Sequence, residues 1–201
     1  LEKWKQQNQK HVMQWFTALG EMEAINSLAT LSFNHPEWCF PVLKEDHFFI
    51  EGKEIGHPLI QADTCVNNPL KIDHNGQLML VTGSNMAGKS TYLRSIGVNT
   101  VLAMAGAPVC ARYFCLSPVQ VISSMRIADN LEENTSTFYA ELKKLKTIIE
   151  KVNSNEKVFI LLDEILRGTS SLDRHTGSAA LIKQLIKHHA ACIIATHDVE
   201  L

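Results

Sequence analysis

The feature that most restricts the fold of this 201-residue chain is a glycine-containing loop between an apolar run and a helix-like segment, in "QLMLVTGSNMAGKSTYL". The loop, from Gly83 to Ser90, satisfies the pattern GxxxxGK[ST]. Gly83 and Gly88 permit backbone turns that aim successive N–H groups inward, and a helix beginning near Lys89 adds the positive end of its dipole. The loop therefore predicts a strand, a phosphate-binding turn and a helix in succession, as at the start of an α/β fold.

The chain after Gly76 continues this alternation. Four short apolar runs, "QLMLVTG", "VQVISSMRI", "KVFILLDE" and "ACIIATH", are separated by segments of helix length. Such runs are typical of strands that are buried on both faces of a parallel sheet. We therefore expect an α/β domain over residues 76–201, with a mainly parallel central sheet flanked by helices.

Two segments precede this domain. Apolar residues from Trp4 to Leu31 recur at three- and four-residue steps, which predicts one or two amphipathic helices. The prolines of "NHPEWCFP" break that pattern, and the β-prone, turn-rich text that follows predicts small strands. We expect a helical segment over residues 1–35, a β-rich lead-in over 36–75 and the main domain over 76–201, in a chain that is a piece of a longer protein.

Composition argues against some classes of function. The chain carries 19 Lys and Arg against 21 Asp and Glu, so its net charge of −2 gives no general electrostatic reason to wrap nucleic acid. It has no apolar run of about 18 residues and no start that resembles a signal peptide, so we expect a cytoplasmic protein. The five cysteines lack a CxxC pair, which favours reduced thiols in or near the core over a disulfide framework or a zinc site.

Five side chains make up a predicted site at the ends of the apolar runs. Lys89 would bridge the β- and γ-phosphates of a nucleotide, and the Ser90 hydroxyl would ligate Mg²⁺. Asp163 can hold Mg²⁺ through water, while Glu164 can accept a proton from an attacking water. His197 is a candidate sensor of the γ-phosphate, since ligands bind beyond the carboxyl ends of such strands.

Each of these features also has a plainer interpretation. A glycine turn can match the loop pattern by chance, although the flanking strand and helix make this a poor explanation. The acidic pair Asp163-Glu164 could close a solvated turn, and His197 could be a hydrogen-bonded structural residue. The sequence favours the phosphate site over these alternatives because all the features occur together.

In this order, the features resemble the ATPase domain of the MutS mismatch-repair family, a branch of the ABC-type P-loop ATPases. The matching segments are "TGSNMAGKSTYLR", "STFYAEL", "LLDEILRGTSSLD" and "ATHDVEL", and the resemblance spans about residues 56–201. It implies a Mg²⁺-dependent ATPase in which Glu164, Lys89 and His197 are catalytic. It also implies that ATP is held by Gly83, Ser84, Asn85, Met86, Ala87, Gly88, Lys89, Ser90 and Thr91.

The resemblance further implies a homodimer of the parent protein. In the family, a serine at the start of the signature helix reaches the γ-phosphate held by the opposite subunit, and the matching positions here are Ser136 and Thr137. Asp173 matches a loop that crosses between subunits and would couple the two sites. The plainer interpretation is that Thr135 and Ser136 cap one helix and Asp173 caps another, and for Asp173 both interpretations can hold. DNA would be bound by domains outside this chain.

The apolar stripe behind Ser136 independently predicts a helix. Its members are Phe138, Leu142, Leu145, Ile149 and Val152.

Several positions depart from the family's pattern. Ser84 and Ala87 replace the usual proline and glycine, and Asn134-Thr135 replaces a glycine-arginine pair. Cys65 stands where an aromatic residue stacks on adenine in mismatch-repair members, and a thiol cannot supply an aromatic face. These departures indicate a divergent member. Two functions remain open: an ATPase that drives the handling of DNA mismatches or junctions, and a nucleotide-gated binding or scaffold module with negligible turnover.

Overall fold

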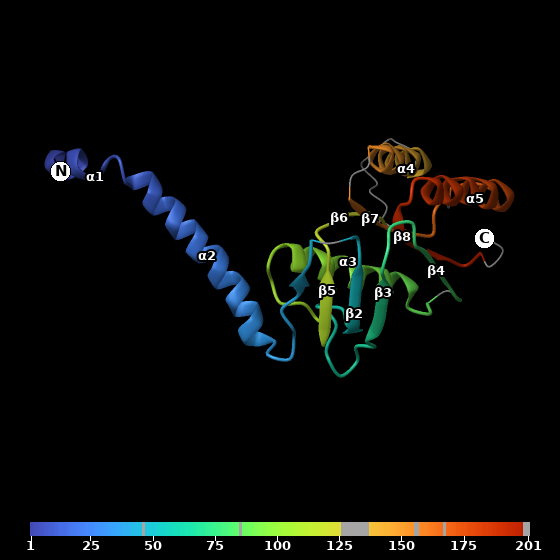
Figure 1. The fold of residues 1–201 in the computed structure, drawn as a ribbon, viewed down its shortest axis with the longest axis horizontal. Coiled ribbons are helices and arrows are strands. Elements are labelled where there is room, and N and C mark those ends of the chain that lie inside the picture. Colours follow the sequence, from blue (N-terminus) through green and yellow to red (C-terminus); the bar gives the residue numbers. More distant parts are fainter. Residues whose placement is uncertain (46, 85, 126–136, 155–156, 167, 199–201) are drawn as a thin grey trace.

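The computed structural model describes residues 1–45, 47–84, 86–125, 137–154, 157–166 and 168–198 (Figure 1). Its helices are α1 (Glu2–Asn8), α2 (Val12–Asn34), α3 (Lys89–Met104), α4 (Thr137–Asn153) and α5 (Ser171–Lys187). Its strands are β1 (Val42–Leu43), β2 (Ile50–Ile55), β3 (Asn68–Ile72), β4 (Leu78–Thr82), β5 (Tyr113–Leu116), β6 (Gln120–Ser124), β7 (Val158–Asp163) and β8 (Ala191–Thr196).

The four predicted apolar runs form one parallel sheet in the order β4-β8-β7-β6. Every residue of the inner strands β7 and β8 is buried, as expected for strands covered on both faces. The prediction of full burial is wrong for the outer strands. Leu80 of β4 is 36% exposed, and β6 is only partly buried, because each of these strands has a neighbour on one side alone.

A second sheet has the order β1-β5-β2-β3 and mixes parallel with antiparallel pairs. The strands β2 and β3 lie in the segment where small strands are predicted. Their partner β5, however, follows α3 in the sequence, and it was not predicted as a strand. The lead-in therefore does not form a sheet by itself, since β5 completes it.

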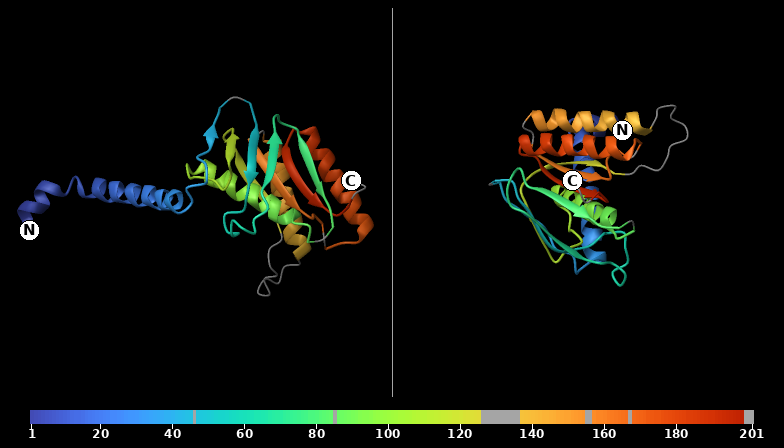
Figure 2. Two further views of the ribbon diagram at one scale, coloured as in Figure 1. Left: turned by 90° about the horizontal axis from the view of Figure 1, so that it is seen from below. Right: turned by 90° about the vertical axis from the view of Figure 1, so that its right-hand side faces the viewer.

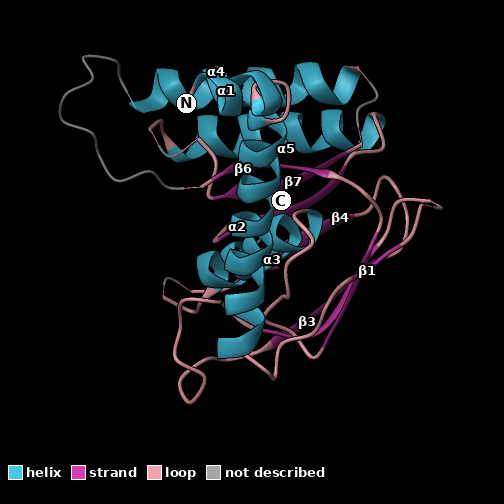
Figure 3. Ribbon diagram, turned by 90° about the vertical axis from the view of Figure 1, so that its left-hand side faces the viewer, coloured by secondary structure: helices cyan, strands magenta, loops and turns pink. Residues whose placement is uncertain are grey.

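The core shows why the two sheets stay together. Along β7, Phe159 and Leu161 pack against α3 and the second sheet, whereas Ile160 and Leu162 pack against α4 and α5. This alternation is the two-residue period of a strand. Figures 2 and 3 show the resulting layers: α4 and α5, the parallel sheet, α3, and the second sheet.

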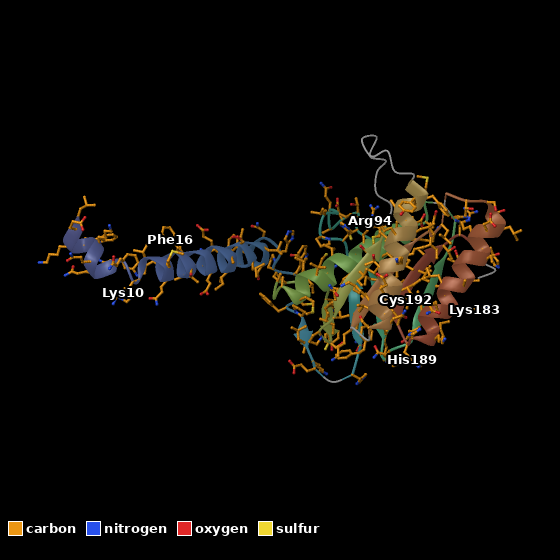
Figure 4. The ribbon with its side chains drawn as sticks, turned by 90° about the horizontal axis from the view of Figure 1, so that it is seen from above. Lys10, Phe16, Arg94, Lys183, His189 and Cys192 are labelled. Atoms are coloured by element: carbon orange, nitrogen blue, oxygen red, sulfur yellow. The ribbon has the colours of Figure 1, made fainter. Side chains whose placement is uncertain are left out.

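The helices α1 and α2 confirm the helical spacing of the N-terminal segment, but the expected buried face is absent from them. No residue of either helix is buried, and α2 extends away from the sheets (Figure 1). Phe16, labelled in Figure 4, is 65% exposed, and Phe33 is 85% exposed. Among the described residues, no helix is both long and apolar enough to span a bilayer.

Helix α4 confirms the predicted helix, but the face that it buries differs from the predicted apolar stripe. Leu145 and Val152 are buried, but Leu142 is 41% exposed and Ile148 takes the core position instead. The 3.6-residue period explains the shift, because a face through residues 138, 141, 145, 148 and 152 leaves residue 142 at its margin.

Replacing Phe159 by alanine should lower the free energy of unfolding by about 3–5 kcal/mol, because Phe159 is fully buried and a cavity would remain. The matched variant Phe33→Ala should change it by less than about 0.5 kcal/mol. Urea unfolding of both variants and the parent chain measures the difference. A similar loss in both variants would contradict the core described above.

Candidate functional site

The glycine loop lies between β4 and α3, as the sequence predicts. Gly88 caps α3 with a φ of +89°, a left-handed backbone that glycine adopts without cost. A Cβ atom there would meet nothing within 4 Å, so the requirement for glycine comes from the backbone and not from space. Met86 also has a positive φ, of +66°. The loop is thus a tight turn that delivers the chain directly into a helix N-terminus.

Lys89 is the first residue of α3, and its side chain turns back into the loop. The residue is 8% exposed, and Nζ donates hydrogen bonds to the carbonyl oxygens of Gly83 at 2.7 Å and of Ser84 at 2.8 Å. The buried ammonium therefore lies beneath the turn together with the helix N-terminus. Both features favour an anion at this position.

The remaining loop residues are mostly open to solvent. Ser84, Met86, Ala87 and Thr91 are exposed, and Ser90 is half-buried in the first turn of α3. Asn85 and Ser136 lie outside the described residues, and Thr137 is the first residue of α4.

Asp163 ends β7 at the same edge of the sheet. Because β8 lies between β4 and β7, and Thr82 pairs with Thr196 while Asp163 pairs with Ala195, the carboxyl ends of three strands meet there. Asp163 is 7% exposed, and its Oδ1 is buried without a hydrogen-bond partner among the described residues.

This orphaned oxygen fits a cation. A buried carboxylate oxygen without a donor is costly unless an ion or a water satisfies it. The described residues contain no group of three or more His, Cys, Asp or Glu side chains that could enclose a metal. One carboxylate together with ligand oxygens suits Mg²⁺, which is usually held by one or two carboxylates plus phosphates and water.

Glu164 follows Asp163 with a left-handed backbone, its φ being +47°. Its N–H donates to the carbonyl oxygen of Ala195 in β8 at 2.9 Å. Its carboxylate Oε2 lies 3.8 Å from Nδ1 of His197, with the two side chains 13% and 43% exposed. The structure thus brings the predicted site residues Glu164 and His197 together at one edge of the parallel sheet. This edge is partly open to solvent, so water can reach the carboxylate.

The turn after Glu164 is held from α4. Leu166 also has a positive φ, of +60°, and its N–H donates to Oε1 of Glu141 at 2.5 Å. Such backbone strain is stable only where the surroundings enforce it, and it is concentrated at functional sites. Glu141 was not predicted from the sequence, although a charged residue at a core-facing position of a predicted helix is a signal for such a role.

A second interaction that the sequence did not reveal fixes the segment after β8. His175 Nδ1 lies 2.8 Å from Oδ2 of Asp198, which joins α5 to the residue after His197. A narrow crevice is lined by Glu164, Ile165, Arg174, Ser178, Thr196, His197 and Asp198.

The start of α5 corrects one interpretation of Asp173. The cap is Ser170, whose Oγ accepts a hydrogen bond from the N–H of Asp173 at 3.2 Å and donates to Oδ2 of Asp173 at 2.7 Å. Asp173 therefore lies in the first turn of the helix, where its negative charge is favourable. Its role between subunits stays a prediction.

A cavity of about 540 Å³ adjoins the glycine loop. Gly88, Lys89 and Cys65 are among the residues that line it. Tyr92 also lines it and donates from its hydroxyl to the carbonyl oxygen of Pro69 at 2.9 Å. Burial raises the pKa of Tyr92, so its hydroxyl stays neutral at physiological pH. The volume is typical of a small-molecule site.

Comparison with known proteins points to one family. A sequence profile described as MutS domain V matches residues 79–201. The chain is 34% identical over 189 residues to "DNA mismatch repair protein MutS" of Thermotoga sp. (strain RQ2), covering 91% of this chain and 23% of that protein. It is also 34% identical over 190 residues to the protein of the same description from Bacillus subtilis (strain 168), covering 91% and 21%.

A third relative is "Mitochondrial DNA mismatch repair protein mutS homolog" of Sarcophyton glaucum, which is 35% identical over 178 residues, covering 85% of this chain and 18% of that protein. The chain thus spans less than about a quarter of the length of these relatives.

Replacing Ser170 by alanine should cost about 1 kcal/mol of unfolding free energy, because the cap of α5 is lost. Ser171→Ala is the matched variant, since Ser171 is the exposed first residue of the helix and should tolerate the change. Urea unfolding measures both. If Ser171→Ala proved as costly as Ser170→Ala, the assigned cap would be wrong.

Proposed function

The chain belongs to the MutS family, and on that premise we propose that it is the ATP-binding and ATP-hydrolysing module of a longer protein. One observation carries the proposal: the buried Lys89 ammonium in the glycine loop and the unpartnered carboxylate oxygen of Asp163 lie at the same edge of a parallel sheet. This pairing supports a P-loop fold of the ABC type, with residues 1–35, 36–75 and 76–201 as its helical segment, lead-in and main domain.

The loop residues bind the triphosphate. Backbone N–H groups from Gly83 to Thr91 face the phosphate oxygens, and the N-terminus of α3 stabilises their charge. The Lys89 ammonium exchanges its bonds to the loop carbonyls for bonds to the β- and γ-phosphates. Because those carbonyls hold it in the loop beforehand, little side-chain entropy is lost on binding.

Ser90 and Asp163 would hold Mg²⁺, Ser90 by its hydroxyl and Asp163 through water. When bound, the ion neutralises phosphate charge and keeps the triphosphate oriented. The unpartnered Oδ1 of Asp163 supports this role.

Glu164 is the general base. It accepts the proton of the attacking water. His197, which lies beside it, donates a hydrogen bond toward the γ-phosphate. The hydrogen bonds from Glu164 N–H to β8 and from Leu166 N–H to Glu141 orient the carboxylate, so that it need not reorganise during the reaction.

The complete site is composite. Ser136 and Asp173 of a second copy act across a homodimer, and the parent protein couples ATP turnover to DNA through domains outside this chain. The relatives' descriptions as DNA mismatch repair proteins support a DNA substrate, such as mismatches or junctions. The five free thiols support a reducing, cytoplasmic location.

The second candidate function is a nucleotide-gated binding or scaffold module with negligible turnover. The observation that favours it is Cys65, which lines the 540 Å³ cavity and matches the position at which mismatch-repair members of the family carry an aromatic residue. Steady-state phosphate release by the full-length protein distinguishes the two functions.

Lys89→Ala should weaken ATP binding by about 10- to 100-fold, because a charge-assisted contact is lost. Glu164→Gln should leave ATP affinity nearly unchanged and lower turnover by about 100-fold or more, because the base is removed. Calorimetric titration and phosphate release measure the two quantities. Lys157→Ala is the control, since this exposed lysine precedes β7 at the end opposite to Asp163.

Equal losses of ATP affinity in Lys89→Ala and Glu164→Gln would contradict the separate roles. A loss in Lys157→Ala as large as in Lys89→Ala would show a general effect of charge.

A further inference from the structure

Two cysteines from distant parts of the chain converge on the turn that follows β2. A Cβ atom placed on Gly56 would lie 3.0 Å from Sγ of Cys110 and 3.1 Å from Sγ of Cys65. The two sulfur atoms can therefore be no farther apart than the sum of these distances. A disulfide requires the two side chains to rotate until the sulfur atoms lie about 2 Å apart.

The backbone around both thiols is fixed by hydrogen bonds. The Gly56 N–H donates to the carbonyl oxygen of Cys110 at 2.8 Å, and the buried Asn99 side chain bonds both the Gly56 carbonyl oxygen and the Cys110 N–H. Sγ of Cys65 accepts from the N–H of His57 at 3.4 Å. Neither thiol is held by another side chain in these contacts, so each can rotate without breaking the fold.

Both thiols can be reached from a cavity. Cys65 lines the 540 Å³ cavity beside the glycine loop and also a second cavity of about 510 Å³. Cys110 lines the second cavity, together with Trp38, Pro58 and Arg112. The second cavity has no role in the proposed ATPase, and it gives a small reagent access to the pair.

We propose that Cys65 and Cys110 form a covalent modification site for low-molecular-weight disulfides such as oxidised glutathione, and that its modification changes the shape of the cavity beside the glycine loop. The thiol chemistry stands by itself, whereas its effect on nucleotide binding rests on the proposed function.

The reaction is thiol–disulfide exchange in two steps. The Cys65 thiolate attacks one sulfur of oxidised glutathione, which forms a mixed disulfide and releases one glutathione thiolate that takes up a proton. The Cys110 thiolate then attacks Sγ of Cys65, forms the Cys65–Cys110 disulfide and releases the second glutathione. The two cysteines are oxidised, and oxidised glutathione is reduced to two thiols.

The second step should be slow at neutral pH. Burial, and to a smaller extent the nearby Cys65, raise the pKa of Cys110 to about 11. The thiolate is the nucleophile. The rate of ring closure should therefore rise by about tenfold for each unit by which the pH is raised, until the pH reaches that pKa. The mixed disulfide on Cys65 therefore accumulates near neutral pH, and the internal disulfide forms faster as the pH is raised.

Either product changes the nucleotide cavity. Glutathione on Cys65 occupies space between that residue and Lys89. The internal disulfide turns Sγ of Cys65 toward Cys110 and breaks its hydrogen bond from His57 N–H, which shifts the wall of the cavity.

The full-length protein is incubated with oxidised glutathione, and its peptides are mapped by mass spectrometry. Wild type should yield glutathione on Cys65 and a cross-linked peptide that contains Cys65 and Cys110. Cys110→Ser should yield the adduct on Cys65 without the cross-link, and Cys65→Ser should yield neither. Cys39→Ser, which removes another half-buried thiol, should react as wild type. An unmodified Cys65 in wild type, or a cross-link to a different cysteine, overturns the proposal.

The effect on nucleotide binding is measured separately on reduced and oxidised wild type. Oxidation should weaken ATP binding at least about tenfold, and a reducing thiol should restore it. Equal ATP affinity of the two forms overturns the proposed effect of the modification on the cavity. If the reduced protein binds no ATP, the proposed function fails, and the peptide map still decides the thiol chemistry.

Discussion

The burial of α3 between the two sheets is the constraint on which the rest of the structure depends. The helix packs against the parallel sheet on one side and the second sheet on the other, and Leu93 and Ile96 are fully buried. Gly97 permits this approach, because a Cβ there would lie 2.9 Å from Cδ1 of Leu161. Since Lys89 begins the same helix, core packing fixes the position of the ammonium. The position of the glycine loop therefore follows from the packing of the core.

The proposed catalytic edge is built at a cost to stability. Glu164 and Leu166 adopt left-handed backbones, and Asp163 buries an oxygen without a hydrogen-bond partner among the described residues. Each of these features is unfavourable in isolation. They persist because β7 is buried on both faces and because Glu141 of α4 bonds the strained turn. The energy gained by burying the strand offsets the strain at its end, where a ligand would relieve it.

The sequence predicted those parts of the molecule that follow from local pattern. The order of apolar runs and the glycine loop predicted the parallel sheet and α3, because a buried strand and a helix N-terminus each leave a local signature. It did not predict β5, which pairs with β2 although α3 lies between the two strands in the sequence. The pairs Glu141 with Leu166 and His175 with Asp198 were missed for the same reason. A long-range contact of a single polar side chain leaves no periodic pattern in the sequence from which it could be predicted.

The residues around Cys65 connect this position to α3. The Asn99 side chain, buried in the middle of α3, bonds the backbone at Gly56 and at Cys110. The turn that carries the thiol pair is therefore tied to the same helix that carries Lys89. A Cβ on Gly56 would lie 2.6 Å from Oδ1 of Asn67, so any other residue there would force the Asn67 side chain to move. Modification of Cys65 would therefore act beside a backbone that hydrogen bonds hold in place. Because Cys65 lines the cavity next to the glycine loop, we expect the modification to alter that cavity more than the fold.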